Sequence, residues 1–273
     1  MGKDSFGQVS GTDYEKRRGM SIVLIGAGNL ATCLGKALKQ AGLLVVQVYS
    51  RTEASAARLA YLLDCPYTTD LKAIDQEAFF YIFALKDQGL EAAIQQMDAN
   101  HGIWVHTAGS MPMHVFEGHN PRYGVFYPLQ TFSKTREVDF RQIPIFVEGS
   151  DPAVEERLQQ LAKQLSTQVY VLSSEKRKYL HLAAVFACNF TNHLYALASD
   201  LLEAEAISRE VLLPLIDETA AKIHDLSPQA AQTGPAIRYD KQVIDKQLAM
   251  LTDPDLQQLY QLLSQSIHKK AKQ

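Results

Sequence analysis

The sequence predicts an α/β fold, a doubly wound sheet followed by an all-helical C-terminal domain. Short apolar runs alternate with helical patterns from Ser21 to Leu172, which is typical of parallel strands joined by crossover helices. A glycine-rich segment follows the first of these runs and opens the first helix. After Ser173 the strand patterns stop and helical patterns fill the remaining hundred residues.

The first two strands and the helix between them frame the glycine-rich segment. Residues 22–25 are short, mostly β-branched and apolar at consecutive positions, as expected for a central strand that is buried on both faces. A helix is predicted over 29–41, with apolar residues on one face and Gly42 in the left-handed position that ends many helices. The second strand is predicted over 44–49.

The later elements continue this alternation and then change to helices alone. We expect strands near 66–68, 79–84, 103–107, 125–127, 143–147 and 169–172, with helices at 53–63, 88–97 and 152–165. One long helix is predicted over 175–206, and its middle is apolar nearly all round, so it needs cover on every side. Further helices are predicted at 209–223, 239–251 and 255–269, the last opened by Asp253 and Pro254.

These patterns divide the chain into a flexible tail and two domains. We predict a tail over residues 1–19, a dinucleotide-binding domain over 20–173, and a helical substrate and dimerisation domain over 174–273. The helical domain is small and its first helix is very apolar. We therefore expect a homodimer in which the C-terminal helices of a second subunit complete the core.

Composition excludes several classes of function. The 273 residues carry 27 basic and 30 acidic side chains, a net charge of −3, and the basic ones are dispersed, so nucleic acid is not an expected partner. The apolar runs are far shorter than the ~20 residues of a membrane-spanning helix. Three widely spaced cysteines in apolar surroundings indicate reduced thiols, and hence a cytoplasmic protein.

The glycine-rich segment has the spacing of a dinucleotide-binding turn. It reads Gly26-Ala27-Gly28-Asn29-Leu30-Ala31, the G-x-G-x-x-A form, directly between a predicted strand and a predicted helix. The first glycine permits a tight turn, the second lets the backbone approach a pyrophosphate, and the small Ala31 allows close packing of helix on strand. A chance pair of glycines is the alternative, and the strand, turn and helix context favours a Rossmann-type nucleotide site.

The end of the second strand selects between the two nicotinamide cofactors. An NAD-binding fold usually carries Asp or Glu there, about 20 residues after the glycines, to receive the ribose hydroxyls. This chain has Ser50, Arg51 and Thr52 instead. Hydroxyls and a guanidinium group bind a 2′-phosphate through charge-assisted hydrogen bonds, so we predict NADP in preference to NAD. The alternative is that Arg51 is a solvated loop cation.

Two further strand ends are expected beside the nicotinamide, because ligands of this fold lie beyond the carboxyl ends of the strands. The first is Ala84, Leu85, Lys86 and Asp87, and the second runs from His106 through Thr107 to Ser110. Their backbone groups can hold the ribose and the carboxamide, and Ser110 or His106 can reach a substrate. For His106, a hydrogen-bonded structural role at the sheet edge is an equal alternative.

Several motifs together resemble a known family. Besides the glycine motif, Ser50-Arg51 and residues 106–110, they are the segments 178–184, 189–190 and 233–240. In this combination, from residue 20 to residue 267, the chain resembles a bacterial family that joins a Rossmann-like NADP-binding oxidoreductase domain to a helical C-terminal domain of unknown function. It is more distantly similar to pyrroline-5-carboxylate reductases, deazaflavin-dependent NADP oxidoreductases and β-hydroxyacid dehydrogenases. The family pattern often has His-Pro where this chain has Tyr127-Pro128.

The resulting hypothesis is hydride transfer from NADPH to a small carbonyl or imine substrate bound between the two domains. His181 and Asn189 are eight residues apart on the predicted long helix, about 12 Å at ~1.5 Å per residue, and so can contact opposite ends of a substrate. We expect His181 to donate a proton or a hydrogen bond and Asn189 to orient the substrate. The alternative is that both are polar residues satisfied inside an apolar helix.

Three further expectations complete the sequence-based picture. Arg238 can pair with Asp240 or bind the carboxylate of an acidic substrate. The histidines and cysteines lack the spacing of metal ligands, so we expect no metal site. A regulatory or sensor protein that binds NADP without catalysis is the second candidate function, because one fold can serve both.

Overall fold

The computed structural model describes residues 19–273, so the predicted tail lies outside the described residues apart from Gly19. The chain divides into two compact units, the first ending at Thr191 and the second spanning Asn192–Gln273. The last strand of the sheet ends at Val171, and the next helix begins at Ser174. The predicted domain boundary between residues 173 and 174 stays a prediction.

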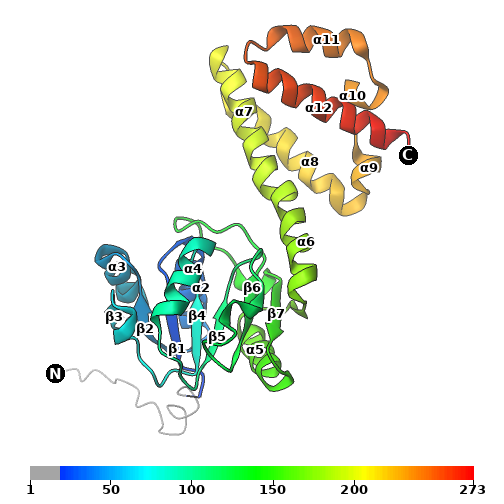
Figure 1. The fold of residues 1–273 in the computed structure, drawn as a ribbon. Helices are drawn as coiled ribbons and strands as arrows, with labels where there is room; N and C mark the ends of the chain where they lie inside the picture. Colours follow the sequence, from blue (N-terminus) through cyan, green and yellow to red (C-terminus); the bar gives the residue numbers. More distant parts are fainter. Residues whose placement is uncertain (1–18) are drawn as a thin grey trace, which may run out of the picture. The chain divides into compact units, whose positions relative to one another are not determined.

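The first unit is built on an eight-stranded sheet in the order β3-β2-β1-β4-β5-β6-β7-β8 (Figure 1). The strands are β1 Ile22–Ile25, β2 Val45–Tyr49, β3 Tyr67–Thr68, β4 Phe80–Phe83, β5 Ile103–His106, β6 Tyr123–Pro128, β7 Ile145–Gly149 and β8 Val169–Val171. All neighbouring pairs are parallel except β6 and β7. The predicted doubly wound α/β sheet is confirmed, with one antiparallel pair added.

Strand β1 is central and buried on both faces, as its unbroken apolar sequence predicts. Ile22 and Leu24 belong to the core cluster on one face of the sheet, and Val23 and Ile25 belong to the cluster on the other face. Such alternation follows from the two-residue period of a strand. The sheet therefore forms the middle layer of three, and both of its faces are core.

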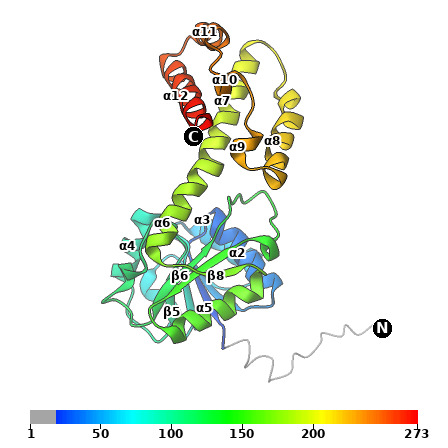
Figure 2. The ribbon, with the colours of Figure 1, turned by 90° about the vertical axis from the view of Figure 1, so that its right-hand side faces the viewer.

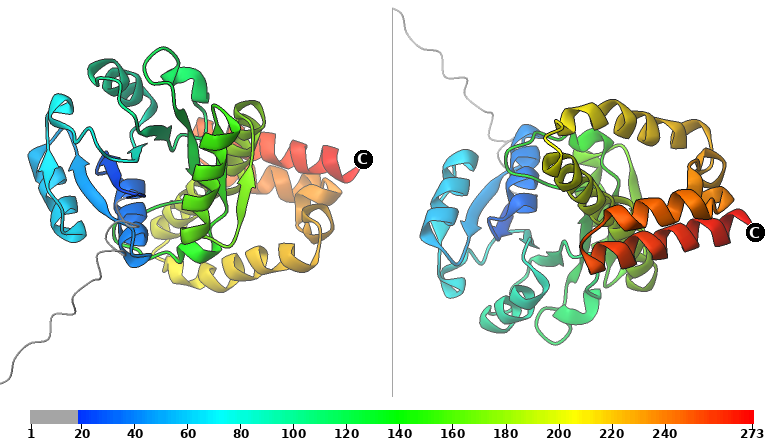
Figure 3. Two further views of the ribbon diagram at one scale, coloured as in Figure 1. Left: turned by 90° about the horizontal axis from the view of Figure 1, so that it is seen from below. Right: turned by 90° about the horizontal axis from the view of Figure 1, so that it is seen from above.

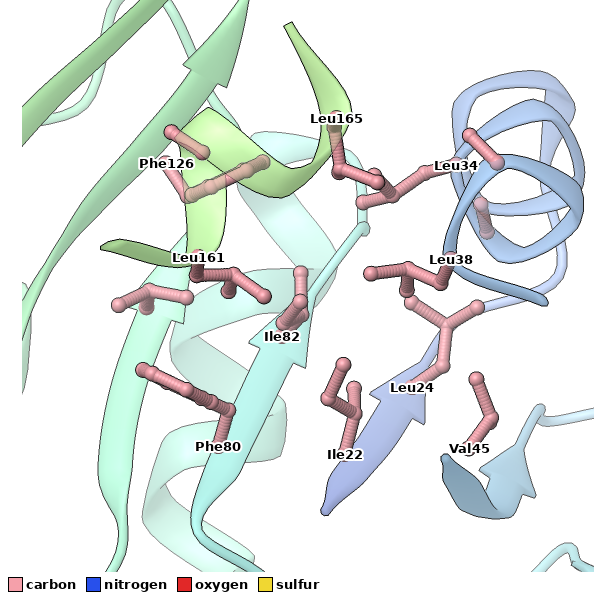
Figure 4. Packing of buried hydrophobic residues seen from close by; sticks show 14 of the residues in the cluster. Ile22, Leu24, Leu34, Leu38, Val45, Phe80, Ile82, Phe126, Leu161 and Leu165 are labelled. Atoms are coloured by element: carbon pink, nitrogen blue, oxygen red, sulfur yellow. The ribbon is translucent and has the colours of Figure 1, made fainter. Parts of the chain in front are cut away.

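Four helices cover the two faces of the sheet. They are α2 Asn29–Gln40, α3 Glu53–Leu63, α4 Asp87–Gln96 and α5 Pro152–Leu165, with short 3-10 turns η1 Leu71–Ala73, η2 Met113–Phe116 and η3 Phe140–Gln142. Helices α2, α3 and α5 pack on one face and α4 on the other (Figure 2). Figure 4 shows Leu38 of α2 beside Leu24 of β1 and Leu161 of α5 beside Ile82 of β4, and it shows Leu34 and Leu165 directed toward each other between the two helices.

Local sequence signals set several helix ends. Gly42 has φ +74° directly after α2, as predicted for a left-handed C-terminal residue. Asp151 accepts hydrogen bonds from the backbone N–H groups of Ala153 and Val154, at 2.8 and 3.0 Å, and so caps α5, which has Pro152 in its first turn.

The predicted long helix is interrupted by a π-helical segment. The chain is helical from residue 174 to residue 204, but as α6 Ser174–Ala184, the π segment η4 Val185–Phe190, and α7 Thr191–Ala204. A single regular α-helix was therefore the wrong expectation for this stretch. A π-helical turn contains more residues than an α-helical turn. Side chains after η4 therefore point in different directions from those that regular α-helical spacing predicts. Neither η4 nor α7 contains a buried residue in the single chain.

The second unit continues with further helices. They are η5 Arg209–Leu212, α8 Leu213–Asp225, α9 Pro228–Ala231, α10 Pro235–Arg238, α11 Lys241–Met250 and α12 Pro254–Ala271. Figure 3 shows α11 and α12 side by side. The short helices α9 and α10 were not predicted; for α10, Gly234 and Pro235 indicated a turn between helices. The predicted cap of the last helix is present: Asp253 accepts a hydrogen bond from the N–H of Asp255, and Pro254 is the first helical residue.

Cys33 is buried, Cys65 is half-buried and Cys188 is exposed, and all three are free thiols. The exposed Cys188 differs from the apolar setting that we expected for it. Across residues 19–273, the helices include none with the length and hydropathy needed to cross a bilayer.

Candidate functional site

The predicted cofactor-binding segments leave the sheet at one edge. The N–H of Gly26 donates to the carbonyl of Tyr49 at 2.8 Å, and the N–H of Ala84 donates to the carbonyl of Ile25 at 2.8 Å. The N–H of Thr107 continues this ladder to the end of the next strand. Strands β2, β1, β4 and β5 are adjacent and parallel, so the loops after them emerge side by side. This is the carboxyl edge, where doubly wound folds bind ligands.

Gly26 and Gly28 have different structural reasons to be glycine. Gly26 has φ +119°, and a Cβ atom there would overlap the carbonyl oxygen of Ala84. Gly28 is exposed and extended, with φ −77° and ψ −169°, and a Cβ atom there would meet no atom within 4 Å. Gly26 therefore lets the turn pack closely against the end of β4. Gly28 leaves open space in front of the N-terminus of α2.

The beginning of α2 fits the pyrophosphate of a dinucleotide. No side chain caps this helix, and the first hydrogen bond of its ladder runs from the N–H of Thr32 to the carbonyl of Gly28 at 3.0 Å. The preceding N–H groups of the first turn are therefore free to bind an anion, and the helix dipole favours negative charge there. Ala27 is buried beneath this turn and Leu30 packs on the core, so their contribution to a ligand is through the backbone.

The loop between β2 and α3 places Arg51 at the adjacent strand end. Ser50 is half-buried, whereas Arg51 and Thr52 are exposed. Arg51 forms no ion pair with any described carboxylate. Thr52 is the N-cap residue of α3, and its side chain makes no capping hydrogen bond. Both hydroxyls and the guanidinium group are therefore available to a phosphate at this position.

The loop after β4 contacts the loop after β5 through the carboxylate of Asp87, the last residue of the predicted strand end. Ser110 donates from Oγ to Oδ2 of Asp87 at 2.6 Å. Both side chains are exposed, and Asp87 is the first residue of α4. Ala84 and Leu85 are half-buried, and Lys86, which is exposed, is the N-cap residue of the same helix. The Asp87 carboxylate thus holds the hydroxyl of Ser110, and this contact joins the two predicted strand ends.

His106 has a structural environment. It is fully buried, its Nδ1 accepts from the N–H of Ala108 at 3.2 Å, and its Nε2 lies 3.2 Å from the carbonyl of Pro112. Burial, reinforced by the charge of Arg177, lowers the pKa of His106 to about 4. The neutral ring therefore holds the loop between Ala108 and Pro112 by both nitrogens. The structural alternative for His106 agrees with these contacts.

The side chain of Thr107, in the same loop, is held by a hydrogen bond. It is buried, and its Oγ1 donates to the carbonyl of Phe83 at 3.4 Å. Its predicted role in holding the cofactor is therefore limited to backbone groups at the end of β5. That role stays a prediction.

A buried ion pair anchors the start of α6 to the sheet and to this loop. Arg177 donates from Nη1 to Oε2 of Glu148 at 2.7 Å, and from Nη2 to the carbonyl of Met111 and to Oγ of Ser174. Ser174 in turn donates to Glu148 from its N–H and its hydroxyl, at 2.8 and 2.6 Å. Its Oγ also accepts from the N–H of Met113 at 3.1 Å. Helix α6, strand β7 and the loop that carries Ser110 are thereby held together.

His181 lies one turn after Arg177 on α6 and packs on the same loop. A Cβ atom at Gly109 would overlap the imidazole ring, so the ring lies directly on the Gly109 backbone. Its Nδ1 is 3.1 Å from the hydroxyl of Tyr127, at the carboxyl end of β6. The structure thus brings His181 to the loop after β5, which also carries Ser110. Arg177 and Glu148 were not predicted as site residues, and Tyr127 was noted only as a departure from the family pattern, because each acts through a partner far away in the sequence.

Asn189 is placed differently from expectation. It is exposed and lies within the π segment η4, so the distance of about 12 Å to His181, which assumed a regular α-helix, no longer applies. Its role as an orienting residue stays a prediction, as does binding of the substrate between the two domains.

The predicted pairing of Arg238 with Asp240 is absent from the described ion pairs. Asp240 instead caps α11, accepting from the N–H of Val243 at 3.3 Å. The charge of Arg238 is therefore left for another partner.

A solved structure from Bacteroides fragilis shares this architecture over nearly the whole chain. The protein, named "putative NADP oxidoreductase BF3122", is 55% identical in sequence and superposes with a TM-score of 0.88. The match covers 93% of this chain and 99% of that chain. This chain belongs to the BF3122 family. The resemblance that the sequence motifs indicated is thereby confirmed.

Other comparisons place the BF3122 family in a wider fold group. Residues 143–267 match the model of a domain of unknown function, DUF2520. Protein TM1727 from Thermotoga maritima is 21% identical, with a TM-score of 0.76, over 92% of this chain and 100% of that chain. An imine reductase from Myxococcus stipitatus, solved in complex with NADP+, is 15% identical, with a TM-score of 0.61, over 92% and 93%. These two similarities show the fold alone. No curated protein sequence matches the chain.

Proposed function

We propose that this member of the BF3122 family is an NADP-dependent oxidoreductase that reduces a small carbonyl or imine compound. The observation that carries the proposal is the uncapped N-terminus of α2 behind the open space at Gly28, with the unpaired Arg51 at the end of the adjacent strand. The helix N-terminus suits the pyrophosphate of NADP, and the arginine suits its 2′-phosphate. The relative BF3122 is named for the same cofactor class.

The residues of this chain divide into cofactor binding and substrate activation. The first turn of α2 binds the pyrophosphate, Ser50, Arg51 and Thr52 bind the 2′-phosphate, and the backbone after β4 and β5 holds the nicotinamide ribose. NADPH, when bound, supplies a hydride to the carbon of a C=O or C=N bond. The displaced electron pair moves to oxygen or nitrogen, where His181 donates a hydrogen bond or a proton. Ser110, held by Asp87, binds the substrate beside it, and Asn189 orients it.

Calorimetry with NADPH and NADH tests the cofactor assignment. NADPH is expected to bind more tightly than NADH. Arg51→Ala is expected to weaken NADPH binding by about 10-fold to 100-fold, because charge-assisted hydrogen bonds contribute about 1.5–3 kcal/mol, and to leave NADH binding unchanged. Arg58→Ala, at an exposed arginine on α3, is the control and is expected to change neither affinity. Equal affinity for both nucleotides, unmoved by Arg51→Ala, would contradict the assignment.

A thermal-shift screen and NADPH consumption together separate an enzyme from a sensor. Carbonyl and imine compounds that stabilise only the NADPH-loaded protein are the candidate substrates. Oxidation of NADPH by any of them supports the reductase. Stabilisation by a compound with no NADPH oxidation, at any concentration of protein, would favour an NADP-responsive regulatory protein instead. Carboxylated members of the panel test the acidic substrate class, since Arg238→Ala is expected to raise KM for those alone.

We also propose that the protein is a homodimer through its C-terminal helices. In the second unit only Ile244 and Ser264 are buried among the described residues, which is too little core for a stable domain. Many large apolar side chains there are exposed, including Val211, Leu215 and Met250 at 63%, 62% and 78%. A second copy of the same surface can cover them.

Light scattering tests this assembly. The mass is expected to be that of two chains at micromolar concentration, and Leu215→Asp is expected to lower it. Tyr61→Ser, at an aromatic residue on α3 that is 87% exposed, is the control and should leave the mass unchanged. A monomer at this concentration would contradict the dimer and would leave the cofactor proposal standing.

A further inference from the structure

Tyr127, which is buried, and His181, which is half-buried, form a hydrogen-bonded pair at the edge of the sheet where the proposed reaction takes place. The two atoms, Tyr127 Oη and His181 Nδ1, are 3.1 Å apart, and the rings meet edge to face with centroids 6.2 Å apart. The other side of the tyrosine ring lies against Phe146 of β7, at a centroid distance of 6.5 Å. Tyr127 is therefore fixed between β7 and α6, and only 7% of it is exposed.

The chemistry of the pair decides which atom donates. Burial raises the pKa of Tyr127 above its ordinary value of 10, so the hydroxyl carries its proton at neutral pH. This is the one hydrogen bond of the hydroxyl within residues 19–273. If His181 Nδ1 donated instead, the buried phenolic proton would lack an acceptor, which costs free energy. The hydroxyl therefore donates, Nδ1 accepts, and the neutral imidazole carries its proton on Nε2.

Two other contacts fix where the imidazole lies. Its ring rests on the backbone of Gly109, in the loop that carries Ser110. One turn earlier, Arg177 anchors α6 to Glu148 and to the carbonyl of Met111 in the same loop. The contact with Gly109 holds one face of the ring, and the Arg177 ion pair holds the helix that carries His181. In the described part of the chain Nε2 makes no hydrogen bond, and the residue is half-buried, so this nitrogen is free to meet a ligand.

We propose that Tyr127 is a positioning residue, which holds His181 in the Nε2–H tautomer so that this N–H is the hydrogen-bond donor to the substrate. The inference rests on the proposed reductase function and narrows its substrate class. An Nε2–H donor needs a lone pair on the reacting heteroatom, which a ketone, an aldehyde or a neutral imine provides and an iminium ion lacks. The proton that completes the reduction then comes from water. Tyr127 itself does not touch the substrate.

Nitrogen NMR on the full-length protein with ¹⁵N-labelled histidine tests the tautomer without any substrate. His181 signals are assigned by their loss in His181→Gln. At neutral pH we expect an unprotonated, hydrogen-bonded Nδ1 and a protonated Nε2. In Tyr127→Phe the Nδ1 signal is expected to shift to that of a free acceptor or to become an average of two tautomers. Tyr123→Phe, on the same strand but without a hydrogen bond to a histidine, is the matched control and should leave the His181 signals unchanged.

Enzyme kinetics distinguish a positioning role of Tyr127 from a purely structural one, because only the positioning role predicts a change in kcat without a change in KM. With a carbonyl substrate, Tyr127→Phe is expected to lower kcat by about tenfold, the worth of one hydrogen bond, with KM and NADPH affinity within about twofold of the original. A protonated Nδ1 in the unchanged protein, or His181 signals that ignore Tyr127→Phe, would overturn the proposal. Absence of NADPH binding would instead refute the reductase and leave the tautomer result intact, so the two failures are distinguishable.

Discussion

Replacing Arg177 by methionine tests whether one buried ion pair holds α6 to the sheet. The Arg177 side chain is 1% exposed and the Glu148 side chain 12%, and their charged atoms are 2.7 Å apart. Methionine has a similar length and no charge, so the change removes the hydrogen bonds and leaves a small cavity. Glu148 then keeps its two hydrogen bonds from Ser174, whereas the carbonyl of Met111 loses its donor.

The expected loss of unfolding free energy is about 3 kcal/mol. Removing one partner of a buried ion pair typically costs about 3–5 kcal/mol, because the other charge is left buried and unpaired. The lower end applies here, since Ser174 still solvates the Glu148 carboxylate. This loss corresponds to a rise of about 100-fold in the unfolding equilibrium constant.

Urea denaturation measures this loss. All variants are compared at one protein concentration, because self-association makes the apparent stability depend on concentration. Lys178→Met, the exposed neighbour on the same helix, is the matched control, and its effect is expected to stay within about 0.5 kcal/mol. The double variant with Glu148→Gln is expected to lose less than the sum of the single changes. A loss below about 1 kcal/mol for Arg177→Met would refute the argument that the pair anchors α6.

Stability measurements on three variants test the environments of His106, Gly124 and Gly89. The pKa of His106 is about 4 when folded, below its ordinary 6.5, so stability should fall as pH drops from 6.5 to 4, by at most about 1.4 kcal/mol per unit. His106→Gln should flatten that slope in urea titrations at pH 7 and 5, and an unchanged slope would contradict it. Gly124→Ala should lower the free energy of unfolding by about 1–3 kcal/mol, because the added Cβ overlaps the backbone of Glu148. A thermal midpoint equal to that of the unchanged protein would contradict this. Gly89→Ala should stabilise α4 by about 0.5–1 kcal/mol, since the space there is open, and a lower midpoint would count against this.

Much of the fold could be predicted because its signals are local. The unbroken apolar run at 22–25 becomes the central strand β1, and residues 53–63 and 152–165 form helices with the predicted bounds. Strand propensity, capping residues such as Asp151 and the glycine-rich turn each act within a few residues. A local rule therefore suffices to find them.

The long helix shows where local rules fail. Its apolar pattern predicted one α-helix, but six residues of it, 185–190, adopt a π-helical form. The sequence pattern does not distinguish the two forms, because both are helical and differ in which backbone carbonyl each N–H group reaches. Asn189 was therefore assigned to the right helix but with the wrong spacing.

The sequence by itself determined the strands, the glycine-rich turn and the cationic strand end, since each depends on neighbouring residues. Tertiary structure alone decided what surrounds His181, Arg177 and Ser110. His181 meets Tyr127 across 54 positions of the chain, Arg177 meets Glu148 across 29, and Ser110 meets Asp87 across 23. Such pairs depend on strand order and on how a helix is rotated against the sheet. No pattern of neighbouring residues encodes them, because the fold, and not the local chain, sets the distance between their atoms.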